Sequence, residues 1–214
     1  MTSNGTGKKS DLRDRKKIET RRLILKCANA LFHERGYAAA TLEDIAERAG
    51  VHKQTVLRYF GSKEEIALAF RHVALQKFKA GLLDPARKVP VLDYWRSFIE
   101  ASAREVSERG DLMRFSKLAE SEPALMAASL SIHMQYEELL ASELSREAGL
   151  NARLDLDSRL LAAFLVAGNF SVARDLLNRG DLRNYVAKAL YVVDFASRKF
   201  PRFAPADRSQ TVTE

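Results

Sequence analysis

The sequence predicts an all-α protein of about nine helices, in which a three-helix N-terminal domain with a helix-turn-helix precedes a helical-bundle C-terminal domain. Three observations support this prediction. Apolar residues recur at intervals of three and four from about Lys16 to Lys199, whereas strand-like alternation is hard to find. Gly and Pro divide this periodic sequence into segments of helical length. The 214-residue chain is 46% hydrophobic and 29% charged, as is typical of a soluble globular protein.

The first helix is expected to begin near Lys16 and to end near Gly36. Residues 1–15 are rich in Gly, Ser, Thr, Asn and Lys, and we expect them to be disordered in isolation. Apolar residues at helical spacing define the buried face of the helix: Ile24, Cys27, Ala28 and Leu31.

The second and third helices form the helix-turn-helix. Thr41 precedes the second helix and can cap its first turn, while Gly50 follows its last apolar residue, where a left-handed backbone ends a helix without steric cost. An apolar stripe predicts the buried face of this helix: Leu42, Ile45, Ala46 and Ala49. The third helix is expected over 53–60, with Val56 and Phe60 directed inward and a polar, cationic outer surface.

The remaining boundaries follow from capping residues, glycines and prolines. The sequence Ser-Lys-Glu-Glu from Ser62 matches a capping box and starts a fourth helix, after which Gly81, Pro85 and Pro90 mark a domain boundary. Further helices are expected over 91–108, 111–119, 123–149, 157–178 and 181–199. The predicted domains are a disordered basic arm (1–15), a helix-turn-helix domain (16–62), a connecting helix (63–80), a helical domain (81–200) and a flexible tail (201–214).

The positive charge is concentrated in the N-terminal part of the chain. Residues 1–81 contain 17 Lys and Arg against 9 Asp and Glu, whereas residues 82–214 contain 18 against 19. The segment with the helix-turn-helix therefore carries the whole excess of positive charge, which favours a polyanionic partner. The alternative is a solvated basic face that keeps the protein soluble.

Several other classes of protein are disfavoured by composition. A single cysteine, Cys27, cannot form an internal disulfide and indicates a reducing, cytoplasmic setting. The N-terminus lacks the apolar core of a signal peptide, and the longest uncharged apolar run, Leu160 to Gly168, is about half a membrane span, so no membrane association is expected. The four histidines show no metal-ligand spacing, and no Gly-rich phosphate loop follows a strand. We therefore expect no metal, no cofactor and no catalytic site.

The stretch from Ile24 to Ile66 resembles the DNA-binding domain of the tetracycline-repressor (TetR) family of bacterial transcription regulators. The resemblance covers about a fifth of the chain and rests on Ala28, Leu31, Phe32, Gly36, Tyr37, Thr41, Ile45, Ala46, Ala49, Gly50, Val51, Tyr59, Phe60, Lys63 and Ile66. It implies a homodimer that binds a palindromic duplex DNA operator, usually as a repressor released by a small-molecule effector in the C-terminal domain.

The resemblance also implies roles for residues of the helix-turn-helix. Thr41 offers its hydroxyl and amide to a phosphate, and His52 takes the capping position where the family more often has serine. Lys53, Gln54 and Thr55 contact base edges. The remaining contacts, to the DNA backbone, are assigned to Arg58, Tyr59 and Lys63. Leu57 departs from the tyrosine common in the family, which puts one phosphate contact in doubt.

The N-terminal basic cluster has two interpretations. A flexible basic arm can enter a neighbouring minor groove, but a solubilising tail has the same composition. The cluster comprises Lys8, Lys9, Arg13, Arg15, Lys16 and Lys17.

The C-terminal half suggests a dimer interface and an effector pocket. The helix over 157–178 is apolar nearly all round and carries small residues that permit close helix approach: Ala163, Ala167, Gly168 and Ser171. The resemblance implies that the last two helices form the dimer interface; the alternative is the central helix of a monomeric bundle. Pocket candidates, each of which is alternatively ordinary core, are Trp95, Phe98, Met113, Phe115, His133, Met134, Asn169 and Arg174.

Two rival functions remain open at this point. One is a ligandless architectural DNA-binding protein, and the other is a helical enzyme with an appended nucleic-acid-binding domain.

Overall fold

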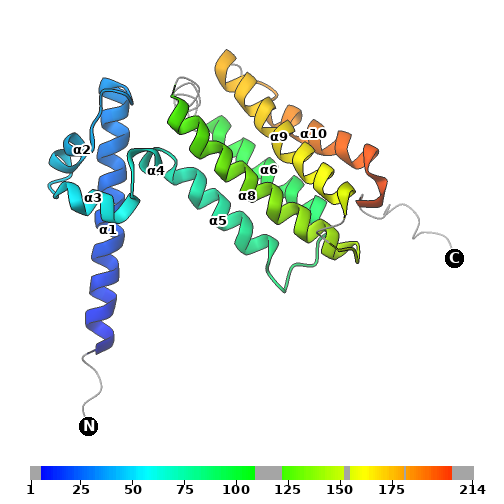
Figure 1. Cartoon of the computed structure of the whole chain (residues 1–214), viewed down its shortest axis with the longest axis horizontal. Coiled ribbons are helices and arrows are strands. Elements are labelled where there is room, and N and C mark those ends of the chain that lie inside the picture. The colour runs from blue at the N-terminus through cyan, green and yellow to red at the C-terminus, as the bar shows by residue number, and fades with distance from the viewer. Residues whose placement is uncertain (1–5, 109–121, 152–154, 181, 204–214) are drawn as a thin grey trace, which may run out of the picture. The chain divides into compact units, whose positions relative to one another are not determined.

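The computed structural model describes residues 6–108, 122–151, 155–180 and 182–203, and within these ranges it is helical without any strand (Figure 1). The helices are α1 (Thr6–Arg35), α2 (Leu42–Arg48), α3 (Lys53–Phe60), α4 (Lys63–Ala67), α5 (Ala69–Leu82), α6 (Val91–Glu108), α8 (Pro123–Glu147), α9 (Leu156–Arg179) and α10 (Tyr185–Lys199), followed by the 3-10 turn η1 (Pro201–Phe203). The all-α prediction is confirmed. The helix expected over 111–119 lies outside the described residues.

The chain forms two compact units, Met1–Phe70 and Arg71–Glu214. The boundary lies near the start of α5, earlier than the glycine and prolines of residues 81–90 suggest. The single connecting helix expected over 63–80 is instead two helices that meet at Leu68. Residues 66–69 are all buried, whereas a regular helix that packs on one side does not bury four consecutive side chains.

Helix α1 begins at Thr6, ten residues before the predicted start, so the expected disorder over 1–15 is not seen from Thr6 onward. The added residues, Thr6 to Arg15, contain no proline, and most of those after Gly7 have a good or moderate helix propensity. Once the helix is nucleated by its packed part, each further residue adds one hydrogen bond and extends it at little cost.

The N-terminal unit has its own core beneath the helix-turn-helix. Glycines end α1 and α2 with a positive φ, at Gly36 (82°) and Gly50 (62°). The core contains these residues from the predicted inner faces of the first three helices: Ile24, Cys27, Ala28, Leu31, Ile45, Ala46, Ala49, Val56 and Phe60. Leu42, also predicted to be buried, is half-buried and packs against this core. This packing fixes the orientation of α3, whose outer face remains in solvent.

The C-terminal unit is a bundle in which α8 packs on α6 and α9, and α10 packs on α6 and α9 (Figure 1). Its core contains Phe78, Trp95, Leu140, Leu165 and Val193 among other side chains. Among the helices of the described ranges, α9 alone is long and apolar enough to cross a membrane. Its contacts with α8 and α10 cover part of this apolar surface.

Candidate nucleic-acid interface and effector site

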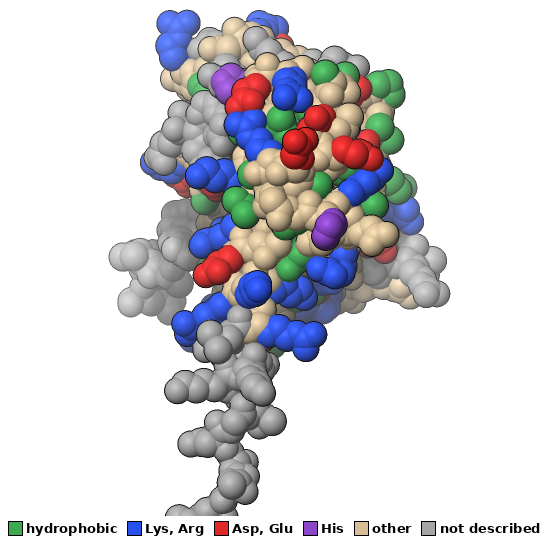
Figure 2. Space-filling model, turned by 90° about the vertical axis from the view of Figure 1, so that its left-hand side faces the viewer, with side chains coloured by type: hydrophobic (Ala, Val, Ile, Leu, Met, Phe, Trp, Pro, Cys, Tyr) green, Lys and Arg blue, Asp and Glu red, His purple; other side chains and the backbone are tan. Residues whose placement is uncertain are grey.

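The outer face of α3 presents polar side chains to solvent. Val56 and Phe60 are buried and anchor the helix, while Lys53 and Gln54 are exposed and Thr55 is half-buried. The three residues predicted to contact bases therefore lie at the N-terminal end of α3, outside the core. Lys and Arg side chains gather toward the lower end of the face shown in Figure 2.

Lys53 forms an ion pair in the absence of DNA. Its Nζ lies 2.5 Å from Glu43 Oε1 at the start of α2. The hydrogen bond from Lys53 lowers the pKa of the Glu43 carboxyl, which stays ionised. Because both side chains are exposed, the pair is weak, and Lys53 can exchange Glu43 for a DNA acceptor at little cost.

Thr41 caps α2 through a reciprocal capping box. Its Oγ1 accepts a hydrogen bond from Asp44 N at 3.1 Å, while Asp44 Oδ2 accepts bonds from Thr41 N at 2.9 Å and from Thr41 Oγ1 at 2.6 Å. The predicted cap is thus present. Both groups that Thr41 was expected to offer to a phosphate are engaged by Asp44, so a phosphate would have to compete with this carboxylate.

His52, Arg58 and Tyr59 complete the predicted surface. His52 occupies the N-cap position of α3, but its side chain makes no capping hydrogen bond. The Arg58 guanidinium is exposed and lies 5.7 Å from the centre of the Tyr59 ring, which itself packs partly against the core. Of this pair, Arg58 is therefore the better placed to reach a phosphate.

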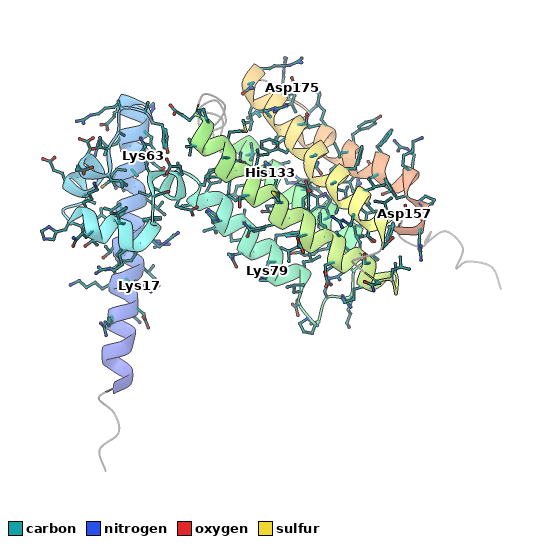
Figure 3. All side chains as sticks on the ribbon, viewed as in Figure 1. Lys17, Lys63, Lys79, His133, Asp157 and Asp175 are labelled. Carbon is teal, nitrogen blue, oxygen red and sulfur yellow. The ribbon has the colours of Figure 1, made fainter. Side chains whose placement is uncertain are left out.

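Lys63, labelled in Figure 3, makes its hydrogen bonds within the protein. Its Nζ donates to Tyr37 O at 2.8 Å and Ala40 O at 3.0 Å, approaches Ala38 O at 3.5 Å, and lies 4.1 Å from the centre of the Tyr37 ring. An ammonium has three donors, and all three are directed at the loop between α1 and α2. Lys63 therefore holds this loop and would have to release it to bind DNA.

We expect a Lys63→Ala substitution to lower the free energy of unfolding by about 1–3 kcal/mol, because the loop carbonyls lose a charged donor. Urea unfolding followed by helical circular dichroism measures this change. Lys26→Ala, which removes an exposed lysine from α1, is the control and should change little. Equal stability of the two variants would contradict the assigned role.

Three of the residues predicted to line a pocket lie next to one another in the C-terminal unit: Trp95, Phe98 and Asn169. The Trp95 indole donates to Asn169 Oδ1 at 3.2 Å, and Asn169 Nδ2 donates to Ala189 O at 2.7 Å. The Trp95 and Phe98 rings belong to an aromatic cluster with Phe78, Tyr94 and Tyr136, with ring centres 4.9–6.0 Å apart. Both the oxygen and the nitrogen of the Asn169 amide thus have a hydrogen-bond partner inside the bundle.

His133 belongs to a second group, which includes three residues that the sequence did not single out: Arg71, Ser129 and Phe170. Arg71 Nη1 lies 2.5 Å from Ser129 Oγ and 3.4 Å from His133 Nε2, so α5 is tied to α8. The His133 ring centre lies 3.9 Å from that of Phe170 on α9. Burial, and then the charge of Arg71, lower the pKa of His133 from 6.5 to about 4. His133 is therefore neutral at physiological pH.

This low pKa predicts a pH-dependent stability. The unfolded chain protonates His133 near pH 6.5, whereas the folded chain protonates it only near pH 4. The contribution of neutral His133 to the free energy of unfolding is therefore fully present above about pH 7 and is lost as the pH falls from about 6.5 to about 4. We expect a loss of about 1–2 kcal/mol, less than the shift alone implies, because water reaches part of the ring. A His133→Gln variant should lack this component. The fluorescence of Trp95, the single tryptophan, reports unfolding. If the wild type and His133→Gln showed the same dependence of stability on pH, the low pKa of His133 would be refuted.

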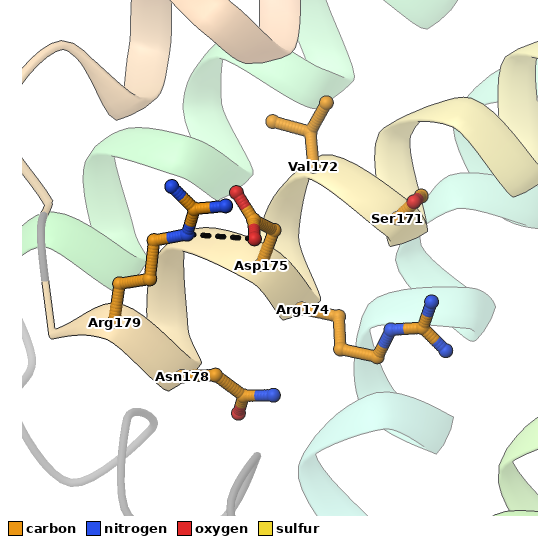
Figure 4. A pocket seen from close by; sticks show the side chains of 6 residues that line it. All are labelled: Ser171, Val172, Arg174, Asp175, Asn178 and Arg179. Atoms are coloured by element: carbon orange, nitrogen blue, oxygen red, sulfur yellow. Dashed lines mark hydrogen bonds and ion pairs between the residues drawn. The ribbon is translucent and has the colours of Figure 1, made fainter.

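The other predicted pocket residues do not join these groups in one cavity. Met134 is 67% exposed on α8. Arg174 lies 6.0 Å from the Phe170 ring centre and lines a hollow of about 420 Å³ on α9 together with Ser171, Val172, Asp175, Asn178 and Arg179 (Figure 4). All six lining residues come from one helix, so the hollow is a surface groove. Met113 and Phe115 lie outside the described residues.

The predicted interface residues of α9 point in different directions. Ala167 and Ser171 are exposed and Ala163 is half-buried. A Cβ on Gly168 would lie 2.7 Å from Val192 Cγ1 on α10, so Gly168 serves the packing of α9 on α10 within one chain.

An exposed apolar surface on α9 and α10 was missed by the search for small residues. It comprises Leu156, Leu160 and Phe164 on α9 with Tyr191 and Phe195 on α10, and we call it the α9–α10 face. Leu156, Leu160 and Tyr191 are 65%, 50% and 60% exposed, and the rings of Phe164 and Phe195 stack with centres 5.5 Å apart. The spacing of four along α9 was the available signal, because it places these side chains on one side of the helix.

The described residues contain no group of three or more His, Cys, Asp or Glu side chains placed to hold a metal ion. Cys27 is buried and free of disulfides.

Comparison with known proteins places these features in a family. Residues 24–70 match the family model of bacterial regulatory proteins of the tetR family. The chain is 32% identical over 189 residues to the HTH-type transcriptional regulator TcmR of Streptomyces glaucescens, covering 84% of this chain and 81% of TcmR. It is 30% identical over 168 residues to the HTH-type transcriptional activator FasR of Mycolicibacterium smegmatis, covering 75% and 73% of the two chains.

Solved structures agree with the fold. SmeT, the repressor of the Stenotrophomonas maltophilia multidrug efflux pump SmeDEF, superposes with a TM-score of 0.64 at 25% identity, covering 91% of this chain and 96% of SmeT. The complex of SmeT with triclosan gives a TM-score of 0.65 at 24% identity, covering 92% and 100% of the two chains.

Proposed function

Because the chain belongs to the TetR family and is a DNA-binding transcriptional regulator, we propose that it is a cytoplasmic homodimeric repressor of a palindromic operator, released when a small molecule binds its C-terminal unit. The observation that carries the proposal is the exposed polar face of α3, held by a buried core in a unit with an excess of positive charge.

The docking follows from the geometry of α3. A recognition helix enters the major groove with its N-terminal residues toward the bases, and here those residues are Lys53, Gln54 and Thr55. Lysine donates to guanine, glutamine pairs with adenine, and threonine offers a hydroxyl and a methyl group. Arg58, one turn further along, would bind a phosphate, with Tyr59 beside it.

We expect Gln54→Ala to cost about 1–3 kcal/mol on the cognate operator and to relax base preference locally, because a paired base loses its partner. Lys53→Ala should have the same kind of effect. Its cost in binding free energy should be reduced by the small energy of the Lys53–Glu43 ion pair, which the wild-type protein gives up when Lys53 binds DNA. Binding to a selected operator and to random duplex measures both effects. Arg58→Ala should weaken the two duplexes alike, since phosphate contacts carry no direct sequence information. An unchanged base preference in Gln54→Ala would contradict the docking.

A homodimer is supported by the α9–α10 face. Apolar side chains gather there on two neighbouring helices, and such a patch marks an interaction site. The same surface on a second copy, related by a two-fold axis, would cover it with a self-complementary contact. Ala163, Ala167 and Ser171 would lie beside the apolar residues and permit close approach, whereas Gly168 would act within each chain.

The effector would bind in the C-terminal unit near two groups of side chains, Trp95 with Asn169 and Arg71 with His133. Arg71 begins this unit and is held to Ser129 and His133 of α8, with Phe170 and Arg174 of α9 nearby. A ligand that disturbs these contacts would move α5, which begins within the DNA-binding unit. Such a ligand shifts the equilibrium only by its preference for the non-binding conformation, typically about 1–3 kcal/mol.

Genomic sites bound by the protein would test the proposal. Sites selected from fragmented genomic DNA should contain an inverted repeat, and a reporter downstream should be silenced by the protein. Metabolites suggested by the neighbouring genes should then release it. Binding that is sequence-independent and insensitive to such compounds would favour an architectural DNA-binding protein. Increased reporter expression would favour an activator, as FasR is described.

A further inference from the structure

The face of α1 that packs on the helix-turn-helix continues toward the N-terminus as a row of cations. Ile24, Ala28 and Leu31 are almost fully buried, at 0%, 0% and 2% exposure. With 3.6 residues per turn, Arg13, Lys17 and Arg21 fall within the same arc of about 80° around the helix axis as these three apolar residues. We call Arg13, Lys17 and Arg21 the basic row.

The basic row begins where the recognition helix ends. The Arg21 guanidinium lies over the Phe60 ring, 4.7 Å from its centre, at the C-terminal end of α3. From there α1 runs on past α3, on the side turned away from α2, and its residues 13–19 are exposed (Figure 1). The packed face of α1 thus changes from apolar to cationic at the point where the helix-turn-helix stops covering it.

We propose that the basic row binds phosphates of the DNA that flanks the half-site contacted by α3. The inference rests on the proposed docking of α3. From Arg13 to Arg21 the row extends over eight residue steps, or about 12 Å at 1.5 Å per step. Phosphates follow one another at about 3.4 Å along the axis for each strand, so the three cations face about three phosphate steps.

This contact differs from that of a flexible arm. An α-helix with its side chains is about 10–12 Å wide, whereas the minor groove of B-DNA is about 6 Å wide. The helical part of the N-terminal segment therefore lies along the phosphates and does not enter the minor groove. Its contribution is affinity and a longer footprint, without base preference of its own.

The same helix supplies a matched control. Arg22 and Lys26 are exposed and lie on the opposite side of α1 from the basic row. Arg22→Ala/Lys26→Ala removes two charges from the same unit, as does Arg13→Ala/Lys17→Ala. A general electrostatic effect would be equal in the two double variants, whereas a contact by the basic row affects only one. Arg21 is left intact in both variants because it also packs on Phe60.

The test measures binding to a duplex that wild-type protein selects from a random pool, carrying about 10 base pairs of flank on each side, as a function of salt. With Arg13→Ala/Lys17→Ala, the log–log slope should become shallower by about 3–4, because two protomers lose four phosphate contacts, and affinity at 0.1 M salt should fall at least about tenfold. The control should keep the wild-type slope. Trimming the flanks should remove the difference between the variants.

Two results would overturn the inference: a wild-type slope for Arg13→Ala/Lys17→Ala, or an equal loss in the control. Arg13→Gln/Lys17→Gln, with circular dichroism to confirm helical content, guards against an effect of altered folding and should reproduce the alanine result. Wild-type protein that selects no sequence would instead refute the proposed function. The two failures are therefore distinguishable.

Discussion

A Phe164→Arg variant is expected to sediment as a monomer of 24.1 kDa at micromolar concentration, where the wild-type protein sediments at twice that mass. Phe164 lies in the α9–α10 face between Leu160 and the stacked Phe195 ring. In a two-fold contact, each copy would bury an unpaired guanidinium, which costs about several kcal/mol and suffices to dissociate a dimer of ordinary affinity. Phe164 is 38% exposed in the single chain, so we expect the fold of the C-terminal unit to be retained, and circular dichroism of the variant checks this.

Specific DNA binding should be lost together with the dimer. One helix-turn-helix contacts only a few base pairs, so a specific operator needs two of them at a fixed spacing. Met134→Arg is the matched control, because Met134 is 67% exposed on α8, away from the α9–α10 face, and this variant should remain dimeric. A Phe164→Arg protein that stays dimeric, or a monomeric wild type, would disprove the assignment. Gly168→Arg is not a clean test, since its Cβ collides with Val192 and helical content should fall.

The second large effect is the response of operator binding to salt. Residues 1–81 carry an excess of eight positive charges, which a dimer doubles. If about 6–8 phosphates are neutralised, the log–log slope of the binding constant against salt should be about −5 to −7. Affinity should then fall about a thousandfold or more between 50 and 200 mM salt. Binding isotherms on the selected operator at four or more salt concentrations measure the slope.

The salt response is informative in both directions. A slope near zero would exclude DNA docking through a cationic surface. A steep slope that is the same for the selected operator and for random duplex, with equal affinities, would indicate binding without sequence preference. The proposed regulator requires a steep slope together with much tighter binding to the selected operator.

The local elements were predictable because their signals lie within a few residues. The cap at Thr41, the glycine at the end of α2 and the inward pair Val56 and Phe60 depend on the preferences of helix ends, on the periodicity of a helix and on the conformations open to glycine. The family resemblance also rested on three of these residues, Thr41, Gly50 and Phe60. Helix boundaries were less certain where composition and helix propagation compete, as at Thr6 to Lys16 and at Leu68.

The partners of individual side chains were not predictable. Lys63 matched a phosphate-binding position of the family, but the folded loop between α1 and α2 brings three carbonyl groups to its ammonium. Likewise, Gly168 looked like a contact between chains until Val192 was placed against it. Phe170 gave no signal in the sequence, because its importance lies in the distances to His133, Arg71 and Arg174.

The sequence by itself determined the helical class, the helix-turn-helix and the concentration of positive charge, because spacing, capping and composition act over one or two helical turns. Only the tertiary structure decided which of the charged and small residues are already engaged, and which surface of α9 and α10 remains uncovered. The physical reason is that a side chain's hydrogen bonds and burial depend on neighbours many positions away in the chain. Pairs such as Arg71 and Ser129, or Arg21 and Phe60, come together only when the helices pack.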